Sequence, residues 1–102
     1  MDTMKGLHAL DWARELSKLP DGHFTIAFFH YSRTRREASG KLKIMERCTH
    51  RAQLPDERFT IDSDNFFLFN DENGDPKMCY RCLIRFMGFP NDNFKLHKIS
   101  WI

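Results

Sequence analysis

The chain has 102 residues, a length that accommodates one hydrophobic core and excludes a second independent one. Ten phenylalanines, two tryptophans and two tyrosines can fill that core without cross-links, because aromatic rings bury large apolar areas. Three cysteines and no recognisable secretory leader favour reduced thiols, and no apolar run is long enough to cross a bilayer. We therefore expect a single soluble domain, residues 1–102, in the cytoplasm.

Charge is distributed unevenly along the chain. Residues 32–51 contain seven Lys or Arg and two Glu, a balance of +5, whereas residues 54–76 contain seven acids and one Arg, a balance of −6. Residues 77–102 contain five bases and one acid, a balance of +4. This alternation indicates either charge pairing within the fold or contact between subunits.

The first half of the chain predicts a helix and two strands. Residues 7–19 carry apolar side chains every three or four positions, as in an amphipathic helix, and Pro20 and Gly22 then end it. Residues 23–31 (HFTIAFFHY) are apolar on both faces and predict a central strand. After a polar, mobile loop, residues 41–50 alternate between basic and apolar side chains, which predicts a strand with a basic outward face.

The second half predicts a connection and three further strands. The connection contains a short strand at residues 59–61, and residues 65–70 and 77–87 flank an Asn-Gly turn as the arms of a β-hairpin. Residues 94–101 predict the last strand. The expected fold class is therefore α+β, with the N-terminal helix packed on a mostly antiparallel sheet of about five strands.

Two cysteines have the spacing of half a zinc site. Cys79 and Cys82 are three residues apart, and Cys48 with His50 or His97 would supply further ligands. Residues three apart on a strand point to opposite faces, so we expect one inward and one outward thiol and no metal.

Two other constellations are weaker. The segment 71–75 (DENGD) groups carboxylates next to a glycine, but its spacing fails the calcium-loop pattern and fits a hairpin turn. Cys48 with His50 or His97 has the residue types of a nucleophile and a base, but the sequence identifies no third residue to orient the base. We expect no enzymatic activity, no catalytic residue and no cofactor.

Basic side chains gather in the loop and strand that follow the central strand, and they are the candidate binding residues: Arg33, Arg35, Arg36, Lys41, Lys43, Arg47 and Arg51. They would contact either acidic residues of a protein or, as the alternative, the phosphates of a nucleic acid with Tyr31 stacked on a base. The candidate interface residues are aromatic side chains beyond what one helix can cover: Phe29, Tyr31, Phe67 and Phe69.

Two stretches, LPDGHFTIAFFHYSRTR and DNFFLFNDENGDPKMCYRCLIRFMGFPNDNFKLHKISWI, carry a resemblance to a known group. They look like small uncharacterised proteins of bacterial prophages and related mobile elements. The resemblance brings no defined motif and no catalytic residue. It implies a context, namely the bacterial host cytoplasm and a virion, assembly or accessory component.

The leading hypothesis is a non-enzymatic structural or protein-binding module that associates with itself or another protein. The alternative is a small nucleic-acid-binding accessory protein that uses the basic residues between positions 33 and 51. We expect no membrane partner and no small-molecule substrate.

Overall fold

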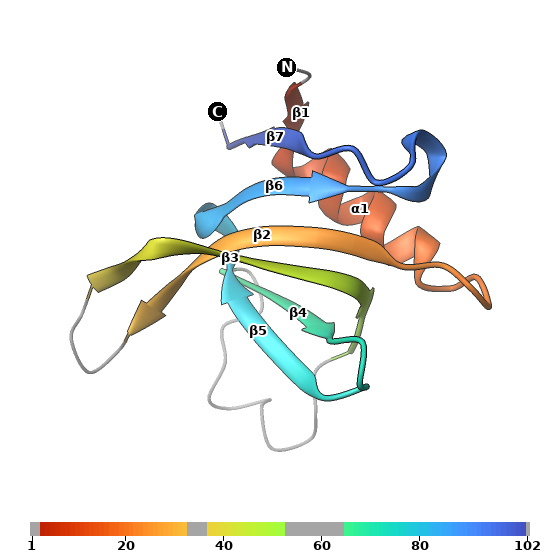
Figure 1. The fold of residues 1–102 in the computed structure, drawn as a ribbon, viewed down its shortest axis with the longest axis horizontal. Coiled ribbons are helices and arrows are strands. Elements are labelled where there is room, and N and C mark those ends of the chain that lie inside the picture. Colours follow the sequence, from red (N-terminus) through yellow and green to blue (C-terminus); the bar gives the residue numbers. More distant parts are fainter. Residues whose placement is uncertain (1–2, 33–36, 53–64, 102) are drawn as a thin grey trace.

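The computed structural model describes residues 3–32, 37–52 and 65–101, which form one α-helix and seven strands (Figure 1). The elements are β1 (Thr3–Lys5), α1 (Gly6–Leu16), β2 (Phe24–Ser32), β3 (Glu37–His50), β4 (Phe66–Asn70), β5 (Pro76–Tyr80), η2 (Arg81–Leu83), β6 (Ile84–Gly88), η3 (Pro90–Asp92) and β7 (His97–Ser100). The strand order is β1-β7-β6-β2-β3-β4-β5. The α+β class is confirmed, whereas the expected sheet of five mostly antiparallel strands is corrected to a mixed sheet of seven.

The extra strands have local causes. β1 pairs in parallel with β7 through Met4 and Ile99, and three residues are too few to show a strand period in the sequence. The predicted strand 77–87 is two strands, because the 3-10 turn η2 redirects the chain. β5 pairs with β4, whereas β6 pairs with β2. A β-rich run that contains no Gly or Pro at such a turn does not reveal the change of partner.

The other boundaries shift by a few residues. The helix ends at Leu16 instead of residue 19, and β3 begins at Glu37 because its ladder with β2 extends to the pair Ser32 and Glu37. The last strand starts at His97, after a turn in which Asn93 and Phe94 adopt left-handed φ values of 60° and 62°. The predicted short strand at residues 59–61 lies outside the described residues.

The core lies on one side of β2, which we call the inner face and which carries Phe24, Ile26 and Phe28. The helix and the β4–β5 hairpin both pack there (Figure 1). Phe24 lies 5.8 Å from Phe67, and Phe28 lies 5.9 Å from Phe69, measured between ring centroids. Burying each of these rings contributes about 1.5–3 kcal/mol, so the aromatic layer is a main source of stability.

A bend in β3 brings the hairpin onto the inner face. The register between β2 and β3 shifts from Ile26–Met45 to Phe24–Cys48, and within this bulge Arg47 adopts a left-handed φ of 56°. Beyond the bend, β3 pairs with β4 only at Thr49 and His50. One strand thus belongs to two differently oriented parts of the sheet.

The β4–β5 turn confirms the predicted hairpin. Oδ1 of Asp71 accepts hydrogen bonds from the backbone N–H groups of Asn73 at 2.9 Å and Asp75 at 3.0 Å. Gly74 has a φ of 82°, which favours glycine. The carboxylate of Asp71 therefore stabilises the turn itself, as the hairpin interpretation requires.

Candidate functional site

The side of the sheet opposite the inner face, which we call the outer face, carries a second set of apolar side chains. Cross-strand partners project to the same side, and the ladders pair Phe29 with Leu42. They also pair Ala27 with both Ile44 and Phe86. The outer face therefore spans β2, β3 and β6.

Much of this apolar surface is accessible. Ile44 is 54% exposed and Leu42 is 36% exposed, while Phe29 and Phe86 are half-buried. The guanidinium of Arg85 lies 5.8 Å from the centroid of the Phe29 ring, within cation–π range. The outer face thus combines an apolar centre with the positively charged side chain of Arg85, and both aromatic residues and arginine are enriched in protein interfaces.

The predicted basic outward face of the strand 41–50 requires correction. Lys41 and Lys43 are exposed, as expected, but Leu42 and Ile44 are exposed as well. The alternating pattern correctly predicted that β3 has a basic and an apolar face. It could not show that both faces are exposed to solvent over residues 41–44. Leu42 and Ile44 are therefore candidate binding residues that the sequence pattern did not single out, although their alternation was visible.

A groove runs beside β3 where β4 diverges from it. One wall is formed by residues 43–46 of β3 and the other by residues 71–73 of the β4–β5 turn. The groove has a volume of about 560 Å³. Its charged side chains are Lys43, Glu46, Asp71 and Glu72, so three carboxylates accompany one ammonium group. This balance disfavours a polyphosphate ligand and suits a polypeptide with mixed charges.

The other candidate cations divide into three cases. Arg47 is exposed at the bend of β3, whereas Arg33, Arg35 and Arg36 lie outside the described residues. Arg51 is only 9% exposed. Its guanidinium donates hydrogen bonds to the carbonyl oxygens of three residues, namely Phe69 at 3.3 Å, Ala52 at 3.2 Å and Lys77 at 3.1 Å. Arg51 therefore joins the end of β3 to β4 and β5, and it is not part of the surface that carries Lys41 and Lys43.

The candidate interface aromatics also separate. Phe29 lies on the outer face, as an interface residue should. Phe67 and Phe69 are 3% and 0% exposed and fill the core of the monomer, which leaves them little surface for a partner. The backbone of Tyr31 belongs to β2, and its side chain lies outside the described part of the structure.

The three cysteines occupy different environments. Cys48 and Cys79 are buried and Cys82 is exposed. Burial raises the pKa of Cys48 to about 12, assisted by Asp71 and Glu72. Burial likewise raises the pKa of Cys79, assisted by the neighbouring Cys48 and Cys82. Both buried thiols are protonated at neutral pH and are poor nucleophiles.

His50 is placed by contacts with the helix. Its backbone N–H donates to Oγ of Ser17 at 2.7 Å, and that hydroxyl donates to the carbonyl of Ala13 at 2.8 Å. Burial lowers the pKa of His50, and the positive charges of Arg14, Arg51 and Arg81 lower it further. The thiol of Cys48, the nucleophile of the predicted pair, has its hydrogen bonds to backbone carbonyls of Met45 and Glu46, at 3.6 and 3.7 Å. These contacts indicate structural roles for both residues.

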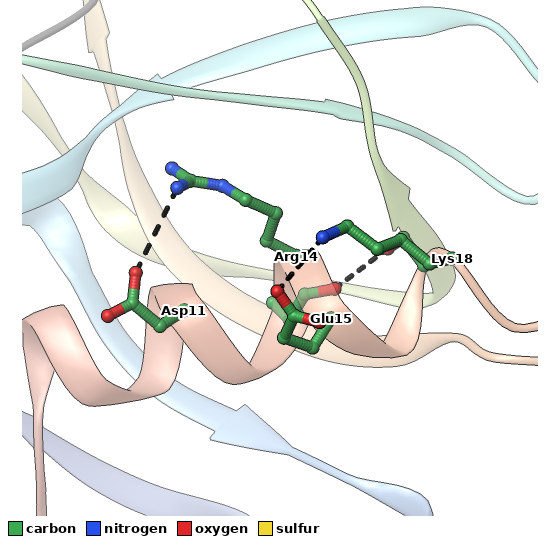
Figure 2. A network of polar contacts seen from close by, with 6 residues as sticks. Asp11, Arg14, Glu15 and Lys18 are labelled. Carbon is green, nitrogen blue, oxygen red and sulfur yellow. Dashed lines mark hydrogen bonds and ion pairs between the residues drawn. The ribbon is translucent and has the colours of Figure 1, made fainter.

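The exposed side of α1 is occupied by its own ion pairs. Figure 2 shows Arg14 with Asp11 at 4.0 Å and Lys18 with Glu15 at 3.0 Å. Pairs that are this exposed contribute little to stability and leave no unbalanced charge for a ligand. We therefore place the candidate binding surface on the sheet and not on the helix.

Residues 3–32, 37–52 and 65–101 contain neither a metal-binding cluster nor a membrane-spanning helix. Within these ranges no three His, Cys, Asp or Glu side chains are grouped to hold a metal ion. The helix in the same ranges is too short and too polar to cross a membrane. No known family, curated protein or solved structure matches the chain.

Proposed function

We propose that this chain is a non-enzymatic protein-binding module whose binding surface is the outer face and the adjoining edge of β3. The observation that carries the proposal is the exposure of Leu42 and Ile44 next to half-buried Phe29 and Phe86. These four side chains come from three neighbouring strands and form a contiguous apolar surface. Contiguous apolar surface on a folded domain is typical of a binding site.

The test compares two substitutions of matched exposure. Ile44→Lys places a charge in the outer face, whereas Leu19→Lys does so at a site away from it, and the two side chains are 54% and 58% exposed. Both variants should fold, because exposed substitutions change stability by about 0.5 kcal/mol or less. Light scattering across concentration and salt, with quantitative cross-linked capture from host lysate, should show association that Ile44→Lys loses and Leu19→Lys keeps.

Two results would overturn the proposal. One is a strict monomer that captures no partner under any condition. The other is a captured set that is identical for Ile44→Lys and Leu19→Lys, because the outer face would then have no part in binding.

The alternative function is nucleic-acid binding, favoured by the exposed row of Lys41, Lys43 and Arg47. The neighbouring Glu46 and Glu72 are exposed as well and would repel phosphates. A gel-shift assay at low salt separates the two functions. Salt-sensitive retardation that the double substitution of Lys41 and Lys43 by Glu abolishes would favour nucleic acid.

The proposed context is a phage virion, assembly or accessory component of the bacterial cytoplasm, as the resemblance implies. The genes next to this one provide the test. Capsid or tail genes would support an assembly role, whereas recombination or repressor genes would favour the nucleic-acid alternative.

A further inference from the structure

The geometry points to β-strand addition as the binding mode: an extended segment of a partner protein pairs with the edge of β3 between Gly40 and Glu46. This inference rests on the proposal that the chain binds proteins. It specifies how the partner binds and which chemistry the partner carries.

In the part of the chain that the structure describes, one edge of β3 is left without a neighbouring strand over most of its length. β3 pairs along one edge with β2, but along the other it pairs with β4 only at Thr49 and His50. After Asn70 the chain enters the β4–β5 turn, and the groove separates this turn from residues 43–46. Within the described ranges, no strand pairs with this second edge at residues 40–46. An added strand would satisfy the backbone N–H and C=O groups there, as in other cases of strand addition.

The side chains of β3 define the pattern of the partner strand. Leu42 and Ile44 project to the outer face, and Lys41 and Lys43 project to the other side. Directly opposed cross-strand pairs are stabilised when apolar faces apolar and when charges are opposite. The partner strand therefore alternates apolar residues with acids, and the apolar residues extend the outer face.

The far end of the groove calls for the opposite charge. Glu46, the last residue of the β3 wall, lines the groove together with Asp71 and Glu72 of the turn. A basic partner residue at this position would complement the carboxylates. The partner is thus an extended segment with one basic end and an alternating apolar and acidic continuation.

A second copy of β3 does not fit this description. Two copies would pair antiparallel about a two-fold axis. Centred on Leu42, this pairing places Lys41 of one copy opposite Lys43 of the other, and centred on Lys43 it opposes the two copies of that lysine. Centred on Ile44, it places Lys41 opposite Arg47. Each register that keeps the apolar residues together therefore opposes like charges, which is destabilising.

The test uses a capped synthetic peptide, Lys-Thr-Val-Glu-Val-Glu-Thr. In antiparallel pairing its Lys lies opposite Glu46, its valines opposite Ile44 and Leu42, and its acids opposite Lys43 and Lys41. Two controls accompany it: the charge-reversed peptide Glu-Thr-Val-Lys-Val-Lys-Thr, and the first peptide with N-methyl groups on alternate backbone amides. The readouts are NMR titration and amide hydrogen exchange of residues 40–46.

The expected result has three parts. The first peptide binds about tenfold more tightly than its charge-reversed form, since three cross-strand pairs change from attraction to repulsion. Its binding slows exchange at alternate amides of residues 40–46, and N-methylation of the amides that face β3 abolishes it. In the variant Lys43→Glu, a substitution of an exposed side chain, the preference between the two charged peptides decreases or reverses.

Other outcomes overturn strand addition. Strand addition is wrong, while protein binding stands, if the N-methylated peptide binds as well as the first peptide. The same holds if the peptide changes NMR chemical shifts on the outer face but does not slow amide exchange of residues 40–46. Protection that grows with protein concentration in the absence of peptide would identify a second copy as the occupant instead. If no peptide binds, strand addition fails, and the comparison of Ile44→Lys with Leu19→Lys still decides the proposed function separately.

Discussion

Replacing Arg51 with methionine should destabilise the protein strongly, although the sequence places this arginine among candidate surface cations. Its buried guanidinium donates hydrogen bonds to three backbone carbonyls, in the chain just after β3, in β4 and in β5. Hydrogen bonds from a charged donor contribute about 1.5–3 kcal/mol each, and methionine recovers part of the loss by apolar packing. We expect the free energy of unfolding to fall by about 3–5 kcal/mol, a large share of the roughly 5–15 kcal/mol typical of a domain.

The assay is urea unfolding followed by tryptophan fluorescence, with Lys43→Met as the matched control on the exposed part of β3. The control should change stability by about 0.5 kcal/mol or less. Arg51→Lys should fall between wild type and Arg51→Met, since it keeps the charge but loses the planar arrangement of donors. A loss below about 1 kcal/mol for Arg51→Met would refute the structural role that these contacts indicate.

Three further predictions follow from close packing and burial. Gly88→Ala should lower the free energy of unfolding by about 1–3 kcal/mol, because the new Cβ would lie 2.7 Å from a backbone carbonyl oxygen. Gly40→Ala is the control, since its new Cβ would have no atom within 4 Å and stability should change little. Thermal unfolding of both variants checks this. Acidification below pH 6.5 should destabilise the fold. The pKa of His50 is lowered from 6.5 in the folded state, so the unfolded state binds more protons. If the free energy of unfolding of His50→Gln fell with pH as steeply as that of wild type, His50 would not be the origin. Above pH 9 the protein should also lose stability, because the pKa of Cys48 is about 12 in the folded state and 9.0 in the unfolded state, which therefore releases its proton first. Thiol labelling checks the burial: exposed Cys82 should react at once, and Cys48 only after unfolding.

The charge segregation of the sequence has a partial explanation in the groove beside β3. Lys43 from the basic stretch and Asp71 and Glu72 from the acidic stretch line opposite walls of it. The two stretches therefore line one groove within a single molecule. The excess of carboxylates there is what requires a basic residue at one end of the proposed partner strand.

Sequence patterns correctly predicted the elements whose structure depends on residues close together in the chain. The apolar spacing of Ala9 and Ala13 fixes the buried side of the helix, and the Asn-Gly pair fixes the β4–β5 turn. They failed where the partner of a strand changes. The run from residue 77 to 87 is rich in β-forming residues from end to end, yet η2 divides it between the hairpin and β2. They failed again at β1, because a strand of three residues is held by β7 and not by its own pattern.

By itself, the sequence determined the α+β class, the amphipathic helix, the hairpin and the presence of more apolar surface than one helix can cover. Those properties depend on side-chain spacing along a few neighbouring residues, which the chain carries locally. Only the tertiary structure decided that Phe67 and Phe69 fill the core, that Arg51 is buried, and that Leu42 and Ile44 remain exposed. Burial depends on which distant segment packs against a residue, and the bend of β3 at Arg47 places the hairpin on the inner face and leaves the outer face accessible.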